Sequence, residues 1–218
     1  MVQASDIEAG HAVYSPAFLR IYDLFVHGLV NHLVWHCPTA ALRALYDRNV
    51  KAHHLDIGVG TGYFLDKARW PAAHPDITLL DLNPHCLDFT SRRISRFAPR
   101  TVVANILEPL PRLGPFDSVG FGYLFHCIPG TIPEKAIAFD YLRPLLAPGA
   151  RVFGATILNS GLPWWRPSQA LMDFYNRMGF FSNAKDTLTD LTAALEQRFD
   201  HVRIDMKGPV ALFEAQAG

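Results

Sequence analysis

The chain has 218 residues, half of them hydrophobic, so it is long enough to bury the core of one globular domain. Its 20 basic and 20 acidic side chains cancel, which argues against a nucleic-acid partner, because phosphates attract a net positive charge. Residues 16–37 are the longest apolar stretch, but charged residues and histidines interrupt them, so they do not predict a membrane-spanning helix. The first residues do not resemble a secretory signal. We therefore expect a cytoplasmic protein without a nucleic-acid or membrane partner.

The cysteines and histidines do not form a recognisable metal-binding pattern. Cys37, Cys86 and Cys127 are odd in number and contain no Cys-x-x-Cys pair, which is typical of reduced thiols and not of a disulfide framework. His32 and His36 lack the Glu of a His-Glu-x-x-His motif. The sequence therefore predicts no metal site.

The first expected elements are helices. In residues 16–36 apolar side chains recur at three- and four-residue spacing, which predicts an amphipathic helix. Pro38 begins a second short helix that runs to about residue 48. We expect residues 1–50 to form a helical cap on a single domain that spans residues 1–218.

From residue 53 the pattern changes to strands that alternate with helices. Strands are predicted at 53–57, 77–82, 101–106, 118–123 and 150–158, with helices at 63–69, 84–97 and 133–146. Such alternation specifies right-handed crossovers and a mostly parallel sheet with helices on both faces. Residues 51–158 are therefore predicted to be a doubly wound α/β core that binds a cofactor.

The remainder, residues 159–218, is predicted to be a lid-like insertion followed by a hairpin. Residues 159–167 are rich in Gly, Pro and Trp, and residues 168–181 form a short helical stretch. A helix at 188–199 leads into strands at 201–207 and 210–215, which a Gly208-Pro209 turn joins into an antiparallel pair.

A glycine-rich loop joins the first strand to its helix. Glycines at 58, 60 and 62 remove the Cβ atoms that would keep a ligand off the backbone, and they permit positive φ. A dinucleotide fingerprint requires Gly-x-Gly-x-x-Gly, but Tyr63 stands where the third glycine belongs. The spacing therefore favours a nucleoside without a pyrophosphate.

Asp56-x-Gly58-x-Gly60-x-Gly62 resembles motif I of the class I S-adenosylmethionine-dependent methyltransferases. The resemblance implies a Rossmann-like seven-stranded sheet of order 3-2-1-4-5-7-6, with the last strand antiparallel and an N-terminal helical cover. It also implies S-adenosyl-L-methionine as cofactor and S-adenosyl-L-homocysteine as product. In this family the loop holds the amino-acid half of the cofactor, so Asp56 would organise the loop or the ligand's amino group.

Two further positions follow the family pattern. Asp81 closes the second strand, where the family carries an acidic residue whose two oxygens accept both ribose hydroxyls. Asn105 stands where an Asp commonly contacts the adenine amino group, and its side-chain carbonyl can accept from that group. With the adjacent Leu82 and Ile106, these residues extend the predicted cofactor site.

Residues for the chemistry are less well marked. His126 lies just past the fourth strand, at the edge of the sheet where ligands bind, and is the candidate general base; a packed loop histidine is the alternative. Tyr14 and Tyr22 resemble a cover over the cofactor, although a core-facing role is equally compatible with their spacing.

Substrate contacts are predicted for Trp164 and Trp165, because aromatic side chains gather in the insertion after the fifth strand. A substrate contact is also predicted for His11, which competes with His126 for the site. Lid packing and a homodimer interface are alternative roles for the tryptophans.

Together these patterns predict methyl transfer to an oxygen or nitrogen of a small, apolar or aromatic molecule, in secondary metabolism. Two alternatives stay open. An NAD(P)-dependent oxidoreductase would share the sheet and the acidic ribose contact. A non-catalytic S-adenosylmethionine-binding module would share the whole cofactor site, so only turnover distinguishes it from an enzyme.

Overall fold

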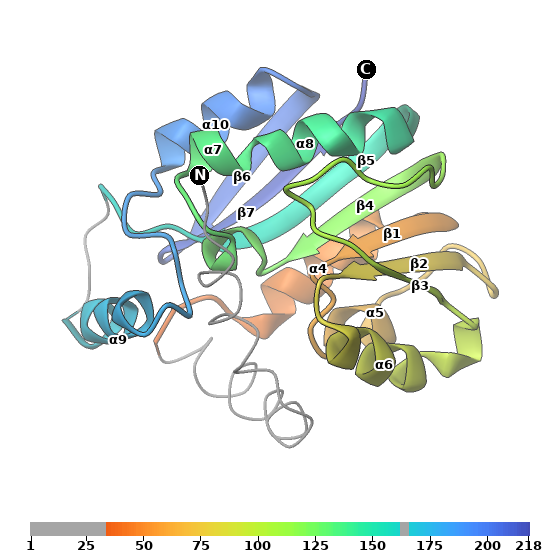
Figure 1. Ribbon diagram of the computed structural model, residues 1–218, viewed down its shortest axis with the longest axis horizontal. Helices are drawn as coiled ribbons and strands as arrows, with labels where there is room; N and C mark the ends of the chain where they lie inside the picture. Colours follow the sequence, from red (N-terminus) through yellow and green to blue (C-terminus); the bar gives the residue numbers. More distant parts are fainter. Residues whose placement is uncertain (1–33, 162–165) are drawn as a thin grey trace.

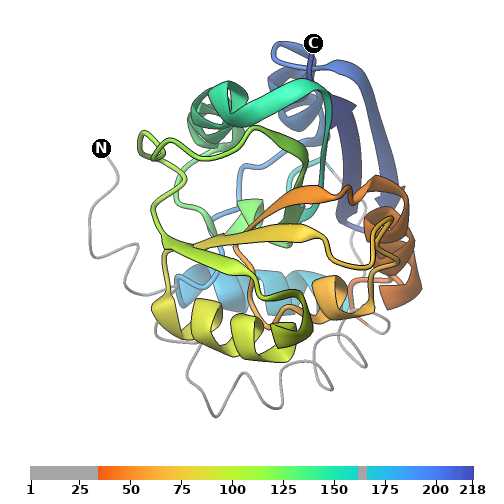
Figure 2. The same ribbon diagram turned by 90° about the vertical axis from the view of Figure 1, so that its right-hand side faces the viewer.

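The computed structural model describes residues 34–161 and 166–218 (Figure 1). Their strands form one sheet in the order β3-β2-β1-β4-β5-β7-β6. Neighbours from β3 to β5 are parallel, whereas β7 is antiparallel to both β5 and β6. The predicted strand order and antiparallel last strand are confirmed. Figure 2 shows the hairpin of β6 and β7 at one edge of the sheet.

The elements have the following bounds. The strands are β1 (His53–Ile57), β2 (Asp76–Asp81), β3 (Arg100–Val103), β4 (Phe116–Gly122), β5 (Leu146–Ile157), β6 (Asp200–Lys207) and β7 (Val210–Gln216). The α-helices are α4 (Thr39–Asn49), α5 (Tyr63–Lys67), α6 (Pro84–Arg93), α7 (Ile132–Lys135), α8 (Ile137–Leu142), α9 (Arg166–Arg177) and α10 (Leu188–Glu196).

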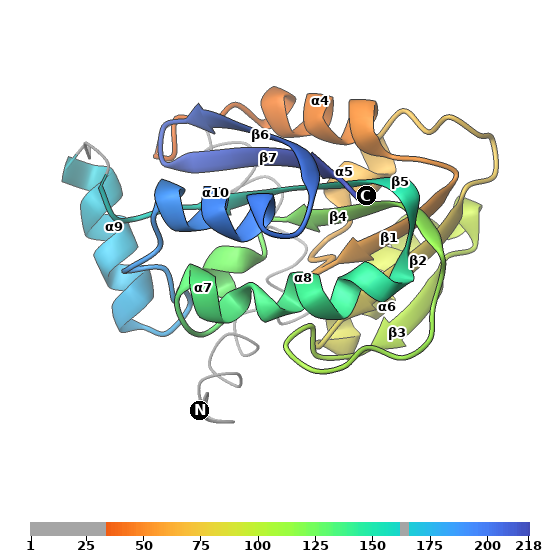
Figure 3. The same cartoon turned by 90° about the horizontal axis from the view of Figure 1, so that it is seen from above.

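Helices cover both faces of the sheet (Figure 3). On one face α7, α8 and α10 bury Ile132, Phe139 and Leu191 against the strands. On the other face α4, α5 and α6 build a second core. Because successive side chains of a strand point to opposite faces, Leu55 and Val119 enter the first core while their neighbours face the second. The central strands are therefore buried on both sides, as a doubly wound sheet requires.

Several predicted boundaries differ from the structure. The helix expected at 133–146 is divided into α7, α8 and a 3₁₀ turn at Arg143–Leu145, and β5 begins at Leu146. Pro144 lies in that turn, where a regular helix would require the N–H that proline lacks. The helix expected at 84–97 ends at Arg93 and continues as a 3₁₀ turn, Ser95–Phe97. β3 is shorter than expected because the chain turns at Asn105.

Most of the predicted helix at 16–36 lies outside the described residues, as do residues 162–165 of the insertion. The predicted helical stretch after these residues corresponds to α9. Within the described ranges, no helix combines the length and the apolar character needed to cross a bilayer.

Candidate functional site

A cavity opens at the carboxyl ends of β1, β2 and β4, where the strand order reverses. Loops after four strands form its wall. The described residues of the predicted cofactor site all line it: Asp56, Gly58, Gly60, Gly62, Asp81, Leu82, Asn105 and Ile106. The structure therefore brings together residues that are up to 50 positions apart in the chain.

The glycine loop has left-handed backbone at each of its glycines, with φ of +70° at Gly58, +52° at Gly60 and +68° at Gly62. A Cβ on Gly58 would lie 2.7 Å from a methyl carbon of Leu124, and one on Gly62 would lie 2.5 Å from a methyl carbon of Thr90. A Cβ on Gly60 would meet no atom within 4 Å. Gly58 and Gly62 thus allow the loop to pack, whereas Gly60 keeps open space beside the backbone.

Asp81 is held by the backbone of two loops. Its Oδ1 accepts the Asn83 N–H at 2.8 Å, and the amides of Val59 and Gly60 also donate to the carboxylate. Burial nevertheless raises the pKa of Asp81 to about 6, and the nearby charge of Asp56 acts in the same direction. At neutral pH the group is ionised, and a hydrogen-bond donor that reaches it would stabilise the charge.

Asn105 forms a turn after β3. Its Oδ1 accepts the Leu107 N–H at 3.0 Å, and its Nδ2 donates to Glu108 Oε1 at 2.9 Å. An amide oxygen has two lone pairs, so Oδ1 retains one for a ligand. Ile106 is buried and Leu82 is partly exposed, and both contribute apolar surface to the cavity wall next to this amide.

Sequence reasoning missed Tyr46, which reaches the cavity from α4. Its hydroxyl donates to Asp56 Oδ2 at 3.0 Å, and burial raises the pKa of Tyr46 well above its usual value. The predicted second helix contains Tyr46, but nothing in the local sequence signals a contact ten residues away. Only the packing of α4 on the sheet reveals it.

The charge of the cavity is negative. Among the described residues that line it, Asp56 and Asp81 are ionisable acids, and no Lys, Arg or His is present. Coulomb attraction therefore favours a ligand with positive charge, and a pyrophosphate would meet two carboxylates. In the same ranges, no three His, Cys, Asp or Glu side chains gather as metal ligands.

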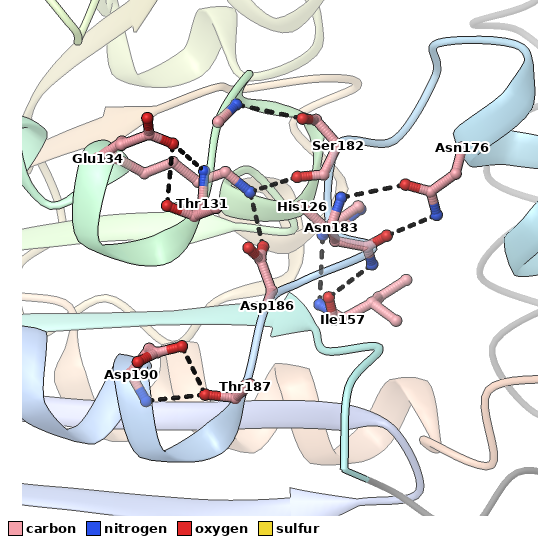
Figure 4. Close-up of polar contacts among 12 residues, drawn as sticks. His126, Thr131, Glu134, Ile157, Asn176, Ser182, Asn183, Asp186, Thr187 and Asp190 are labelled. Atoms are coloured by element: carbon pink, nitrogen blue, oxygen red, sulfur yellow. Dashed lines mark hydrogen bonds and ion pairs between the residues drawn. The ribbon is translucent and has the colours of Figure 1, made fainter.

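His126 is not among the described residues that line the cavity. It lies next to Ile157 instead (Figure 4). It is only 4% exposed, its Nδ1 accepts the Ile157 N–H at 3.3 Å, and Phe181 packs on its ring at 4.5 Å. Burial, assisted by the charge of Lys135, lowers the pKa of His126 to about 3. Cys127, the next residue, lines the cavity instead. This placement agrees with the packed-loop alternative and does not support the predicted general base.

Hydrogen bonds of Ser182, which Figure 4 labels, and of Lys135 hold the cavity wall that follows β4. The Ser182 N–H donates to the His126 carbonyl at 2.8 Å, and the Ser182 hydroxyl accepts the Gly130 N–H at 3.2 Å. Residues 127–129 line the cavity between these two contacts. Lys135 Nζ donates to the Ser182 carbonyl at 2.7 Å and to Asp186 Oδ2 at 2.6 Å, and both charged side chains are fully buried.

The remaining predicted contacts, His11, Tyr14, Tyr22, Trp164 and Trp165, lie outside the described residues.

Two curated proteins are similar over nearly the whole chain. Demethylluteothin O-methyltransferase of Streptomyces thioluteus is 45% identical over 207 residues, which cover 94% of this chain and 90% of that protein. The physcion biosynthesis cluster O-methyltransferase of Aspergillus chevalieri is 36% identical over 218 residues, which cover 99% and 98%. The chain belongs to the class I methyltransferases. This methyltransferase spans almost the full length of both relatives.

The same fold occurs in solved structures. The DhpI complex with S-adenosylhomocysteine superposes on this methyltransferase with a TM-score of 0.65 and 16% identity, and covers 100% of this chain and 99% of that one. At this identity the likeness shows the fold alone. No family profile matches the chain. Since the similar proteins are methyltransferases, the oxidoreductase alternative is left without support.

Proposed function

We propose that this methyltransferase uses S-adenosyl-L-methionine to methylate an oxygen or nitrogen of a small apolar or aromatic molecule in secondary metabolism. The observation that carries the proposal is the charge of the cavity. Two carboxylates and no cationic side chain line its described part, beside a glycine loop with open space at Gly60. The proposed cofactor bears a sulfonium, an ammonium and a ribose diol, which are the groups that such carboxylates attract or accept.

Each described residue of the site suits one part of this cofactor. Asp81 offers two acceptor oxygens, as two neighbouring ribose hydroxyls require. Asp56 faces the cavity beside the glycine loop and suits the ammonium group. The second lone pair of Asn105 Oδ1 suits the adenine amino group, and Leu82 and Ile106 suit its faces.

The acceptor side of the cavity is apolar. It extends from the glycine loop to the loop after β4, and it is lined by Tyr63, Tyr123, Leu124, Cys127 and Ile128. When bound, the cofactor supplies a methyl group activated by positively charged sulfur, so the chain mainly has to orient the acceptor and exclude water. An apolar wall serves both purposes. Two of the relatives are named O-methyltransferases, which supports oxygen before nitrogen as the acceptor atom.

Among the described residues that line the cavity, no side chain has an imidazole or amine that could accept the acceptor's proton. Tyr14 and Tyr22 remain predicted cofactor contacts, and His11, Trp164 and Trp165 remain predicted substrate contacts. The homodimer, the cytoplasmic location and the division into cap, core and insertion also stay predictions.

Titration calorimetry tests the cofactor first, and turnover then tests the reaction. We expect the purified chain to bind S-adenosylhomocysteine and not NAD⁺. With S-adenosylmethionine and a panel of phenols, enols and aromatic amines, it should release S-adenosylhomocysteine together with a methylated product. Binding without turnover on any acceptor would favour the non-catalytic module, and no binding at all would contradict the proposal.

A further inference from the structure

Behind Asp56 lies a group of buried polar side chains for which the proposed function has no use. His54 of β1 and Ser118 of β4 have no exposed surface, and Tyr46 of α4 is 2% exposed. Polar side chains are costly to bury unless they are hydrogen-bonded, so such a group in the centre of a sheet calls for an explanation. It lies on the sheet face of the second core, where the rings of Tyr46 and His54 both pack on Phe153.

The strand register builds this group. In the pairing of β1 with β4, His54 is opposite Ser118 and Asp56 is opposite Gly120. A Cβ on Gly120 would lie 2.7 Å from Asp56 Oδ2, and a Cβ on Gly122 would lie 2.6 Å from the Tyr46 hydroxyl. Neither glycine has a positive φ. Their role is therefore spatial, because they make room for the carboxylate and for the hydroxyl that reaches it.

The hydrogen-bond partners determine which atoms carry protons. Ser118 Oγ accepts the Lys51 N–H at 2.9 Å, so its own hydrogen can be donated to His54 Nδ1, which lies 2.8 Å away. The imidazole hydrogen is then on Nε2, which faces Asp56 Oδ2 at 3.5 Å. In the opposite tautomer the lone pair of Nε2 would face the carboxylate oxygen, which would repel it. The tautomer with hydrogen on Nε2 is therefore favoured.

Two donors thus approach the same oxygen of Asp56, His54 Nε2–H at 3.5 Å and the Tyr46 hydroxyl at 3.0 Å. Hydrogen bonds to the ionised form of a carboxylate stabilise that form. With Oδ2 engaged from behind, Oδ1 is the oxygen that remains for a ligand in the cavity that Asp56 lines.

We propose that Tyr46, His54 and Ser118 are positioning residues that orient the Asp56 carboxylate so that it receives the ammonium group at the amino-acid end of the cofactor. The inference rests on the proposed function. It assigns a role to three side chains that act through Asp56, and to Gly120 and Gly122, which make room for two of the polar groups. Tyr46 is held in place because the next turn of α4 is tied to β7, where Glu214 accepts from Arg48 and Asn49.

The test compares two ligands on the full chain by titration calorimetry. S-adenosylhomocysteine carries the amino-acid group, whereas 5′-methylthioadenosine retains the adenosine and the sulfur but lacks that group. Tyr46→Phe and His54→Leu should weaken S-adenosylhomocysteine binding by about tenfold each, the scale of one hydrogen bond to a charged group. Both variants should bind 5′-methylthioadenosine as the wild type does, which also reports that they are folded.

Three controls sharpen the result. His54→Gln restores a nitrogen donor near Asp56 and should recover part of the affinity that His54→Leu loses. Tyr141→Phe removes a hydroxyl from α8, far from Asp56 in the sequence and outside the cavity lining, and should change neither affinity. In an Asp56→Asn background, Tyr46→Phe should have no further effect, since the carboxylate that it orients is absent.

Unchanged S-adenosylhomocysteine affinity in both Tyr46→Phe and His54→Leu would overturn the inference and leave the proposed function intact. Equal losses for both ligands would also overturn it, because they would indicate a general structural role. A wild-type chain that binds neither ligand would refute the proposed function, and the inference with it.

Discussion

Two buried polar networks border the cavity. The first, the Asp56 network, consists of Tyr46, His54, Asp56 and Ser118. The second, the Lys135 network, consists of His126, Lys135, Ser182 and Asp186. Each contains a buried histidine next to charge, so residue types alone do not tell them apart. What differs is the atom that meets the cavity.

The Asp56 network ends on a side chain that lines the cavity, whereas the Lys135 network meets it only through the backbone of residues 127–129. The first should therefore govern how tightly a ligand binds, and the second should govern whether the wall is in place. A buried polar network can therefore affect ligand affinity or the position of the wall, depending on which atoms it contacts. Substitutions in each network distinguish these two roles.

Lys135→Met should have the largest effect, and it should be an effect on stability. The substitution leaves Asp186 buried without its partner, and breaking a fully buried pair costs about 3–5 kcal/mol. Urea denaturation would measure the loss. The double variant Lys135→Met/Asp186→Leu removes both charges and should recover most of it. A single variant as stable as the wild type would show that the pair does not support the wall.

Asp81→Asn should weaken ligand binding without lowering stability, in contrast to Lys135→Met. Without the carboxylate, we expect S-adenosylhomocysteine to bind about 10–100-fold more weakly, because a charged acceptor becomes a neutral one. Since burial raises the pKa of Asp81, the ionised group opposes folding, and its removal should stabilise the ligand-free chain by on the order of 1 kcal/mol, allowing for solvent screening. Calorimetry and thermal unfolding would measure the two effects, and a parallel loss in both would contradict this account.

Ligand affinity should fall as the pH falls through about 6. The ligand requires the ionised form of Asp81, whose folded pKa is about 6, so at pH 5 the affinity should be about tenfold lower. The folded pKa lies above the ordinary value of 3.8, so this group alone makes the ligand-free chain less stable as the pH rises from about 4 to about 6. Titrations between pH 5 and pH 8 test this, and in Asp81→Asn this contribution to the pH dependence should disappear.

His126→Asn should have the smallest effect. The Asn Oδ1 can take the place of Nδ1 and accept the Ile157 N–H, so the wall should keep its position. A general base contributes about 10²–10⁴-fold to a rate, whereas we expect kcat to change by less than about threefold. A hundredfold fall in kcat with unchanged ligand affinity would restore the base role that the geometry does not support.

The sequence was sufficient to predict the sheet and a set of residues that line one cavity. The strand order is the one that the family resemblance implies, and the glycine loop, Asp81 and Asn105 are adjacent in sequence to the strands that position them. Residues at the carboxyl ends of parallel strands must meet at one edge of the sheet, so their proximity needs no knowledge of side-chain packing.

The positions of His126 and Tyr46 depend on packing. His126 follows β4 as expected, but a 3₁₀ turn at Phe125–Cys127 directs Cys127 to the cavity and His126 to β5. Sequence spacing does not specify which residue of so short a turn faces the ligand. Tyr46 reaches Asp56 from a helix whose own pattern explains it as a core residue. Such contacts follow from how α4 lies on the sheet, and no local motif encodes that.

The position of β7 has a consequence for folding of the chain during translation. Residues 210–216 fill the place between β5 and β6, and Glu214 within them anchors α4, the helix that carries Tyr46. While the ribosome is still adding the preceding residues, β5 lacks this neighbour and exposes a strand edge on which other chains can pair. The glycine loop is synthesised early, but the hydrogen bonds from α4 to Glu214 can form only after β7 has been synthesised. A nascent or truncated chain that ends before residue 210 would therefore be prone to aggregate.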